Sequence, residues 1–291
     1  MENVNAGLVV LNYNDWSNTC HFVKQIKDYT ILEKIVVVDN NSSDDSYEHL
    51  LDLRSDKVDV IKAEKNGGYG YGNNIGIAHL KERYGVGVIF ISNPDVLVEE
   101  GPMVKCVSVL NDYTDSAVVA PRMINIDGTV NWRSAWRCPS YYQYLLFPFK
   151  IFQPLTSRIY YNCEESNQSI FPVECVAGSF FAISKRFFEN NVVFDDNIFL
   201  YCEETLLGLK IKQAGLKTYM LNDVYFVHFH SVSVNKSIKK IKQDIIMLKS
   251  REYILNNYYP SSMMRRAINR ATKEAAMMKY SIKRIIMRGA K

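Results

Sequence analysis

The feature that most constrains the fold is a succession of short apolar segments, each ended by a polar or glycine-rich turn. The first four are Gly7–Leu11, Ile35–Val38, Val58–Ile61 and Val88–Ser92. Runs of β-branched residues of this length favour buried strands, and the stretches between them carry spaced apolar residues typical of helices. Strands that alternate with helices indicate βαβ units. The sequence therefore predicts an α/β fold with a mixed, mainly parallel sheet flanked by helices.

Length and composition limit the class of protein further. The chain has 291 residues, of which 47% are hydrophobic, so it can bury a full core. It has no run of 18 apolar residues, and we expect no transmembrane helix. Its start lacks the basic and apolar segments of a signal peptide. The six cysteines form no CxxC pair, which is typical of free thiols in a cytoplasmic protein.

The charge is distributed unevenly along the chain. Residues 236–291 contain 15 Lys and Arg against 3 Asp and Glu, whereas residues 1–235 contain 20 against 28. We therefore predict two parts, an acidic α/β domain over 1–235 and a basic tail over 236–291. A basic tail on an acidic body indicates contact with an anionic surface, either a membrane or a nucleic acid.

The tail shows the pattern of two helices separated by Pro260. In the second helix, apolar residues recur at spacings of three and four, and lysines and arginines mostly fill the other sides; the stripe is Met264, Ile268, Ala271, Ala275, Met278, Ile282 and Ile285. This pattern is typical of a helix in the interface of an anionic membrane, which predicts a peripheral protein at the inner face of the cell membrane. Docking on its own domain or on another subunit, as in a homo-oligomer, is the alternative.

The fourth predicted strand runs into a turn that carries a carboxylate. Pro94 cannot donate in a ladder and biases Asn93 to an extended conformation, so the strand ends there. Asp95 then lies at the carboxyl end of a central strand, where open α/β sheets bind ligands. An ordinary Asn-Pro-Asp turn explains the same residues equally well.

A glycine-rich stretch over 66–76 follows the third strand, with five glycines between 67 and 76. We expect it to be a loop that opens a helix from Ile75 to Leu80, whose first amides favour an anion such as a diphosphate. It lacks the Gly-Lys-Ser/Thr of a Walker A loop and does not follow the first strand as a dinucleotide fingerprint does. A flexible connection is the alternative.

The middle of the chain, from Arg122 to Pro172, loses its periodicity and is rich in aromatic residues with interspersed arginines, including Trp132 and Arg137. Such a segment suits a wall that binds sugar or lies near lipid, although packing is the commoner reason for aromatic residues and a nucleic-acid face would look similar. Next, Gly178 interrupts a strand pattern before Ser179, at a place where a ligand can approach.

Two further clusters contain side chains that can transfer protons or bind a metal. Glu203 and Glu204 begin a helix pattern, where the helix dipole stabilises carboxylates; simple charge complementation is the alternative. His228 and His230 end the last strand pattern and on a strand would point to the same side, so either could be a metal ligand. A structural role is the alternative and is the commoner one for a single histidine.

Taken in order, these pieces resemble an inverting family 2 glycosyltransferase with the GT-A fold, of the bacterial rhamnosyltransferase-like kind, over about residues 6–235. The motifs that carry the resemblance are Leu11-Asn12-Tyr13-Asn14, Val38-Asp39-Asn40-Asn41-Ser42, Asn66-x-Gly68-Tyr69-Gly70-x-Gly72-x-Asn74-x-Gly76, Asn93-Pro94-Asp95-Val96, Arg137-Cys138-Pro139-Ser140, Tyr201-Cys202-Glu203-Glu204 and residues 228–233.

The resemblance implies a role for each motif. Asn12, Tyr13, Asn14, Asp39 and Asn41 would hold the nucleotide, and Gly68 and Asn74 would lie along the donor pocket. Asn93-Pro94-Asp95 stands where the family has Asp-x-Asp, so Asp95 alone would supply the carboxylate to Mg²⁺ or Mn²⁺. His228 would be the second metal ligand, with His230 as the alternative. Trp132, Arg137, Gly178 and Ser179 would lie on the acceptor side.

The resemblance also implies the reaction. Glu204, or Glu203 beside it, would be the general base for transfer of a sugar from a UDP- or dTDP-sugar to a hydroxyl of a glycan acceptor, such as a lipid-linked oligosaccharide. We expect an enzyme of cell-surface polysaccharide synthesis, with no nucleic acid as partner. A non-catalytic nucleotide- or nucleic-acid-binding module is the alternative function.

Overall fold

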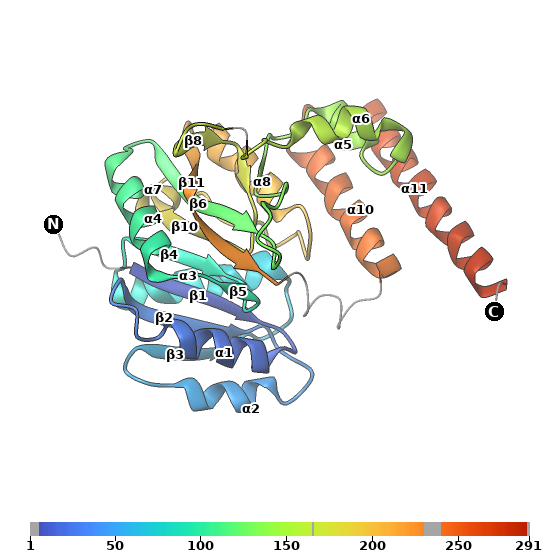
Figure 1. The fold of residues 1–291 in the computed structure, drawn as a ribbon. Helices are drawn as coiled ribbons and strands as arrows, with labels where there is room; N and C mark the ends of the chain where they lie inside the picture. The colour runs from blue at the N-terminus through green and yellow to red at the C-terminus, as the bar shows by residue number, and fades with distance from the viewer. Residues whose placement is uncertain (1–5, 165, 230–239, 290–291) are drawn as a thin grey trace.

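The computed structural model describes residues 6–164, 166–229 and 240–289 (Figure 1). Side chains in the last range are described only for residues 241–278. The strands have the bounds β1 Ala6–Asn12, β2 Leu32–Asp39, β3 Val58–Lys62, β4 Val88–Ser92, β5 Val96–Leu97, β6 Ser116–Ile124, β7 Ala135–Trp136, β8 Ile170–Val173, β9 Cys175–Val176, β10 Phe180–Ser184 and β11 Lys217–His228. The α-helices have the bounds α1 Trp16–Ile26, α2 Ser46–Leu50, α3 Tyr69–Tyr84, α4 Glu100–Asp112, α5 Tyr141–Leu146, α6 Gln153–Thr156, α7 Lys185–Glu189, α8 Glu203–Gln213, α10 Lys240–Asn257 and α11 Met263–Gly289.

Within these residues, a nine-stranded sheet runs in the order β3-β2-β1-β4-β10-β6-β11-β5, and β8 pairs with β11 outside this path. The four strands from β3 to β4 are parallel, so their carboxyl ends lie along one edge. β10 is antiparallel to both of its neighbours, and β6 and β11 are parallel to each other. The predicted mixed α/β sheet is therefore confirmed.

Helices cover both faces of the sheet, as burial of both faces of a parallel sheet requires. One core packs α1, α2 and α4 on the sheet through side chains such as Phe22, Leu50 and Leu110. The other core packs α3, α7 and α8 through side chains such as Leu80, Phe187 and Leu207. This arrangement leaves the carboxyl edge of β1, β2 and β4 uncovered by these helices.

The glycine-rich stretch differs from its prediction, because the helix that it was expected to open begins at Tyr69 rather than Ile75. Most of the glycines are therefore helical. A Cβ at Gly72 would lie 2.2 Å from Leu11 Cδ1, and one at Gly76 would lie 2.5 Å from Val9 Cγ1. These glycines let α3 approach β1 closely, and packing explains them better than a phosphate-binding loop.

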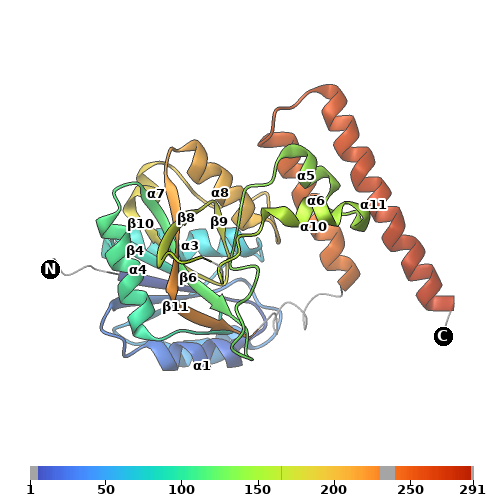
Figure 2. The ribbon, with the colours of Figure 1, turned by 45° about the horizontal axis from the view of Figure 1, so that its top comes forward.

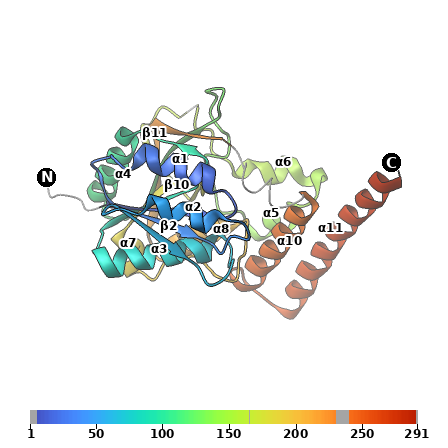
Figure 3. The ribbon, with the colours of Figure 1, turned by 90° about the horizontal axis from the view of Figure 1, so that it is seen from below.

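The last two helices form an arm beside the sheet (Figures 1 and 2). α10 packs on α5 and on the start of α8, where Ile254 and Leu255 are buried together with Tyr144, Leu145, Ile198 and Leu206. α11 lies along α10 on the side away from the sheet (Figure 3). The helix break around Pro260 is confirmed, because α10 ends at Asn257 and α11 begins at Met263. In the described part of the chain, no helix has the length and apolar character needed to cross a bilayer.

Candidate active site

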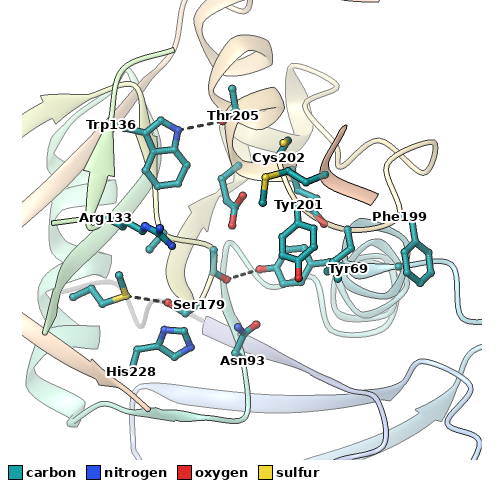
Figure 4. Close-up of a pocket in the computed structure, with 18 of the residues that line it drawn as sticks. Tyr69, Asn93, Arg133, Trp136, Ser179, Phe199, Tyr201, Cys202, Thr205 and His228 are labelled. Carbon is teal, nitrogen blue, oxygen red and sulfur yellow. Dashed lines mark hydrogen bonds between the residues drawn. The ribbon is translucent and has the colours of Figure 1, made fainter. Parts of the chain in front are cut away.

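A cavity of about 680 Å³ opens at the carboxyl edge of the sheet, a volume typical of small-molecule sites. Its floor is formed by the loops that follow β1, β2 and β4. Its walls come from the segment before β10, the start of α8, the end of β11, the aromatic middle segment, and α10. Figure 4 shows His228 and Asn93 on one side of this space and Cys202 with Thr205 on the other.

Asp95 and His228 meet on one wall of the cavity. β5 pairs antiparallel with the end of β11, which sets His228 opposite Val96, and the Phe229 amide donates to the Asp95 carbonyl at 3.0 Å. The Nε2 atom of His228 lies 3.3 Å from Oδ1 of Asp95, and the two side chains are 13% and 6% exposed. A nitrogen and a carboxylate oxygen thus face one point from two neighbouring strands.

Glu203 and Glu204 lie on another wall, in the first turn of α8. The carboxylate of Glu204 occupies the space above Gly178, because a Cβ at that glycine would lie 2.5 Å from Glu204 Oε1. Glu203 is 6% exposed, and its Oε1 has no hydrogen-bond partner among the described residues. A side chain at position 178 would displace the Glu204 carboxylate. The glycine there is thus explained by the position of Glu204 as well as by the approach of a ligand.

Burial changes the acidity of both carboxyl groups. The pKa of Glu204 is raised by desolvation, while the backbone amides of Glu204 and Gly178 act in the opposite direction. The pKa of Glu203 is raised well above its ordinary value, first by desolvation and then by the charge of Glu204. Because two neighbouring buried carboxyls do not ionise together easily, the pair favours a state with one shared charge, and the larger rise at Glu203 favours the proton on that side chain.

The backbone before α8 is strained. Tyr201 and Cys202 both have positive φ, at 69° and 74°, a region that non-glycine residues seldom adopt. Phe199, two residues earlier, accepts a hydrogen bond from the Tyr69 amide at 3.0 Å. Strain of this kind costs of order 1–3 kcal/mol per residue and collects at functional sites. Here it turns the chain so that Glu203 and Glu204 face the cavity.

The structure brings most of the predicted chemistry-bearing residues together. Those that line the cavity are Tyr13, Gly68, Asn93, Asp95, Trp132, Gly178, Ser179, Glu203, Glu204 and His228. His230, the alternative metal ligand, lies outside the described residues. The predicted residues that do not line the cavity are Asn12, Asn14, Asp39, Asn41, Asn74 and Arg137.

Asp39 is fully buried beneath the loops rather than in the cavity. Its carboxylate accepts hydrogen bonds from Asn12 Nδ2 at 2.9 Å and from the Ser42 amide at 3.0 Å. Asn14 continues this link, because its side-chain oxygen accepts from the Ser43 amide at 2.8 Å. These polar groups join the loop after β1 to the loop after β2, and so position Tyr13 and Asn40 at the cavity.

Asn74 and Arg137 have other partners. The Asn74 side chain donates to the Phe194 carbonyl at 3.1 Å and so anchors the segment before α8 on α3. The guanidinium of Arg137 stacks on the ring of Tyr161, with 4.3 Å to the ring centroid. Arg133, four residues earlier, lines the cavity instead (Figure 4). Its guanidinium lies against the Trp132 ring, 4.6 Å from the ring centroid.

Several cavity residues were not singled out from the sequence. The most informative are Met247 and Arg251, one helical turn apart on α10, because they show that part of the basic tail forms a wall of the site. Trp136 is a second example, and its Nε1 donates to Thr205 Oγ1 at 3.1 Å (Figure 4). The aromatic content of the middle segment was a signal for this wall, but its pattern did not identify which rings face inward.

Solved glycosyltransferase structures share the fold. A mannosyltransferase from Pyrobaculum calidifontis, solved with GDP-Man and Mn²⁺, superimposes with a TM-score of 0.58 at 12% identity, covering 99% of this chain and 76% of that one. S. aureus TarS residues 1–349 gives a TM-score of 0.54 at 13% identity, covering 96% and 72%. The predicted GT-A fold is thereby confirmed.

Sequence comparison identifies the family. The profile of "Glycosyl transferase family 2" matches residues 8–190. The hexosyltransferase Agl10 of low-salt glycan biosynthesis in Haloferax volcanii is 23% identical over 76% of this chain. The N-acetylglucosaminyl-diphospho-decaprenol L-rhamnosyltransferase of Mycobacterium tuberculosis is 25% identical over 69%. This chain spans about two thirds of each relative, 66% and 68% of their lengths. The chain belongs to glycosyl transferase family 2.

Proposed function

We propose that the chain transfers a sugar from a nucleotide diphosphate sugar to a hydroxyl of a glycan acceptor, with inversion at the anomeric carbon. The observation that carries this proposal is that one cavity joins the Asp95–His228 pair to the Glu203–Glu204 pair. The relatives' names, a hexosyltransferase and a rhamnosyltransferase, support a hexose or a rhamnose as the transferred sugar. We propose a UDP-hexose or dTDP-rhamnose as the donor.

The Asp95–His228 pair fits a divalent cation, Mg²⁺ or Mn²⁺. In the described part of the chain, no cluster of three or more His, Cys, Asp or Glu side chains could hold a metal. Asp95 and His228 would therefore hold the ion as a pair, and phosphate oxygens and water would supply its other ligands. Two solved structures with this fold contain Mn²⁺ with UDP or GDP-Man, which supports the choice of metal. When bound, the ion supplies positive charge beside the departing diphosphate.

The carboxylate pair supplies the proton chemistry. Glu204, as the charged member, accepts the proton of the acceptor hydroxyl while that oxygen attacks the anomeric carbon from the face opposite the nucleotide. Glu203, as the protonated member, keeps the negative charge on its neighbour and anchors the acceptor. Tyr13 and Asn40 face the nucleotide, and Asp39 acts by holding their two loops together.

Metal-dependent nucleotide binding tests the donor half of this proposal. At about 100 times Kd, a nucleoside diphosphate should raise the unfolding free energy by about 2.7 kcal/mol. We expect this stabilisation in a thermal-shift panel of UDP, dTDP and GDP with Mn²⁺, and its loss without metal. His228→Ala should reduce the metal-dependent part of this stabilisation. His21 is an exposed histidine on α1, and His21→Ala should leave the stabilisation unchanged. No shift with any nucleotide would contradict the proposal.

The arm gives the proposed enzyme a second partner. The described residues of the predicted apolar stripe on α11 are exposed, with Met264 71%, Ile268 40% and Met278 65% accessible. α11 instead turns Asn269 and Ala276 inward, where Asn269 bonds Asn256 of α10 and Tyr141 of α5. We propose that the stripe, with the basic residues beside it, binds an anionic membrane at the cytoplasmic face, where a lipid-linked acceptor would be met.

Liposome binding tests the membrane proposal. Each arginine near an anionic surface contributes about 1 kcal/mol, so Arg266→Gln with Arg270→Gln should weaken binding to phosphatidylglycerol vesicles about 30-fold. Met263→Ser with Met264→Ser should weaken it as well, because both side chains are more than two-thirds exposed. The control is Ile126→Ser, an apolar residue 69% exposed in the turn after β6. Equal binding of all variants would refute a membrane role for α11.

A further inference from the structure

Arg251 of α10 is a buried cation in the wall of the cavity. Its side chain lines the cavity, yet the residue is only 9% exposed. The guanidinium stacks on Phe147, 4.2 Å from the ring centroid, and lies 5.7 Å from the centroid of Tyr144. Its Nε has no hydrogen-bond acceptor, and no carboxylate of the described residues forms an ion pair with it. Buried arginines are almost always paired, so this one is unusual.

The position of Arg251 is fixed by a packed helix. Ser250 donates to the Leu200 carbonyl at 3.0 Å, and Tyr253 OH donates to Asp195 Oδ2 at 3.0 Å. Ile254, on the next turn, is fully buried. Lys273 of α11 pairs with Glu252 at 2.8 Å and braces the outer side of α10. The guanidinium is therefore presented by a rigid element to a defined point of the cavity.

That point belongs to the carboxylate side of the cavity rather than to the Asp95–His228 side. Ser250, the residue before Arg251, donates to the Leu200 carbonyl, three residues before Glu203, and Ile254 and Leu255 on the next turn of α10 pack with Leu206 of α8. In agreement with this position, the pKa of Cys202, which burial raises to about 11, is lowered by the charge of Arg251. The proposed donor diphosphate lies at Asp95, so Arg251 faces whatever occupies the acceptor side.

We propose that Arg251 binds a phosphate group carried by the acceptor, so that the acceptor is a sugar esterified through phosphate or diphosphate. This inference rests on the proposed glycosyltransferase function and deepens it. The planar guanidinium forms paired hydrogen bonds with phosphate oxygens, and the phosphate completes the pairing that the protein leaves open. Beside the proposed phosphate site, Phe147, Tyr144 and Met247 form an apolar surface. This surface suits the first carbons of an alkyl chain attached to the other side of the phosphate.

Binding of defined probes tests the assignment. The donor site is first saturated with Mn²⁺ and the nucleoside diphosphate that binds best. Calorimetry then compares N-acetylglucosamine linked through diphosphate to an undecyl chain with the neutral undecyl glycoside and with undecyl glucuronide. We expect the wild-type protein to prefer the diphosphate probe, and Arg251→Gln to weaken the affinity for that probe alone by about 10- to 100-fold. The affinity of Arg251→Lys for the diphosphate probe should lie between those of the wild type and Arg251→Gln.

Controls separate this role from a structural one. Lys249→Gln removes an exposed charge from the same helix and should bind all probes as the wild type does. Arg251→Gln should not lower Tm, since it removes an unpaired buried charge. The assignment would be overturned if Arg251→Gln lost equal affinity for the diphosphate and neutral probes, or lost none. It would also be overturned if the wild type did not prefer the diphosphate probe, or preferred the glucuronide in a way that depends on Arg251. Nucleotide binding by both proteins is measured first, because its absence would instead reject the proposed function.

Discussion

Replacement of Glu204 by Gln is expected to lower kcat by about 10²–10⁴, the contribution of a positioned general base. The amide keeps the shape of the side chain above Gly178 but cannot take a proton from the acceptor. Nucleotide affinity should stay at the wild-type value, because the Asp95–His228 pair is untouched. Glu189→Gln on α7 is the matched control, since that carboxylate is exposed and lies outside the cavity.

The pH profile gives this prediction a second readout. Burial raises the pKa of Glu204, so the base is lost by protonation at a higher pH than an ordinary glutamate would show. Activity of the wild type should therefore fall on the acidic side through that raised pKa, and the remaining activity of Glu204→Gln should lack this limb. Glu203→Gln should keep most of the activity, because the raised pKa of Glu203 favours its protonated form, which the amide resembles. Full activity in Glu204→Gln would exclude it as the base.

Replacement of Gly68 by Ala is expected to destabilise the protein by more than about 4 kcal/mol, or to prevent folding. Gly68 has a φ of 93°, and a Cβ there would lie 1.9 Å from the Phe199 carbonyl oxygen. Backbone cannot give way as a flexible side chain can. The clash would also push apart α3 and the strained segment that presents Glu203 and Glu204. Denaturant unfolding measures the loss.

Gly85→Ala separates the clash from the cost of the backbone conformation. Gly85 ends α3 with a φ of 61°, and a Cβ there would meet nothing within 4 Å. Its substitution should cost only the left-handed penalty, about 1–2 kcal/mol. If both alanine variants lost similar stability, the close approach of the Phe199 segment to Gly68 would not be the reason for the glycine.

The sheet could be predicted well because each of its first four strands is recognisable from its own residues. The apolar runs that became β1 to β4 end at turn residues, and the alternation with helices left few topologies. The start of α3 was missed because its glycines were interpreted as a loop signal. Gly72 and Gly76 are four residues apart, which is the spacing of one helix face, and this was the overlooked sign of helix-on-strand packing.

The candidate site was predictable only where the residue itself carries chemistry. Asp95, Glu203, Glu204 and His228 could be proposed from the turn, the helix start and the strand end that hold them, and they share one cavity. Arg251 could not, because nothing local distinguishes it from the other basic residues of the tail. Its importance depends on the packing of α10 against residues 198–206, which are far away in the sequence. This packing decides which face of α10 turns toward the cavity.

A crystal structure of the protein with Mn²⁺ and a bound nucleoside diphosphate tests the central claim most directly. The anomalous signal of the metal should lie about 2.0–2.3 Å from a carboxylate oxygen of Asp95 and from Nε2 of His228. The terminal phosphate should point across the cavity toward Glu204. A nucleotide bound elsewhere, or a metal with no contact to Asp95, would contradict the account.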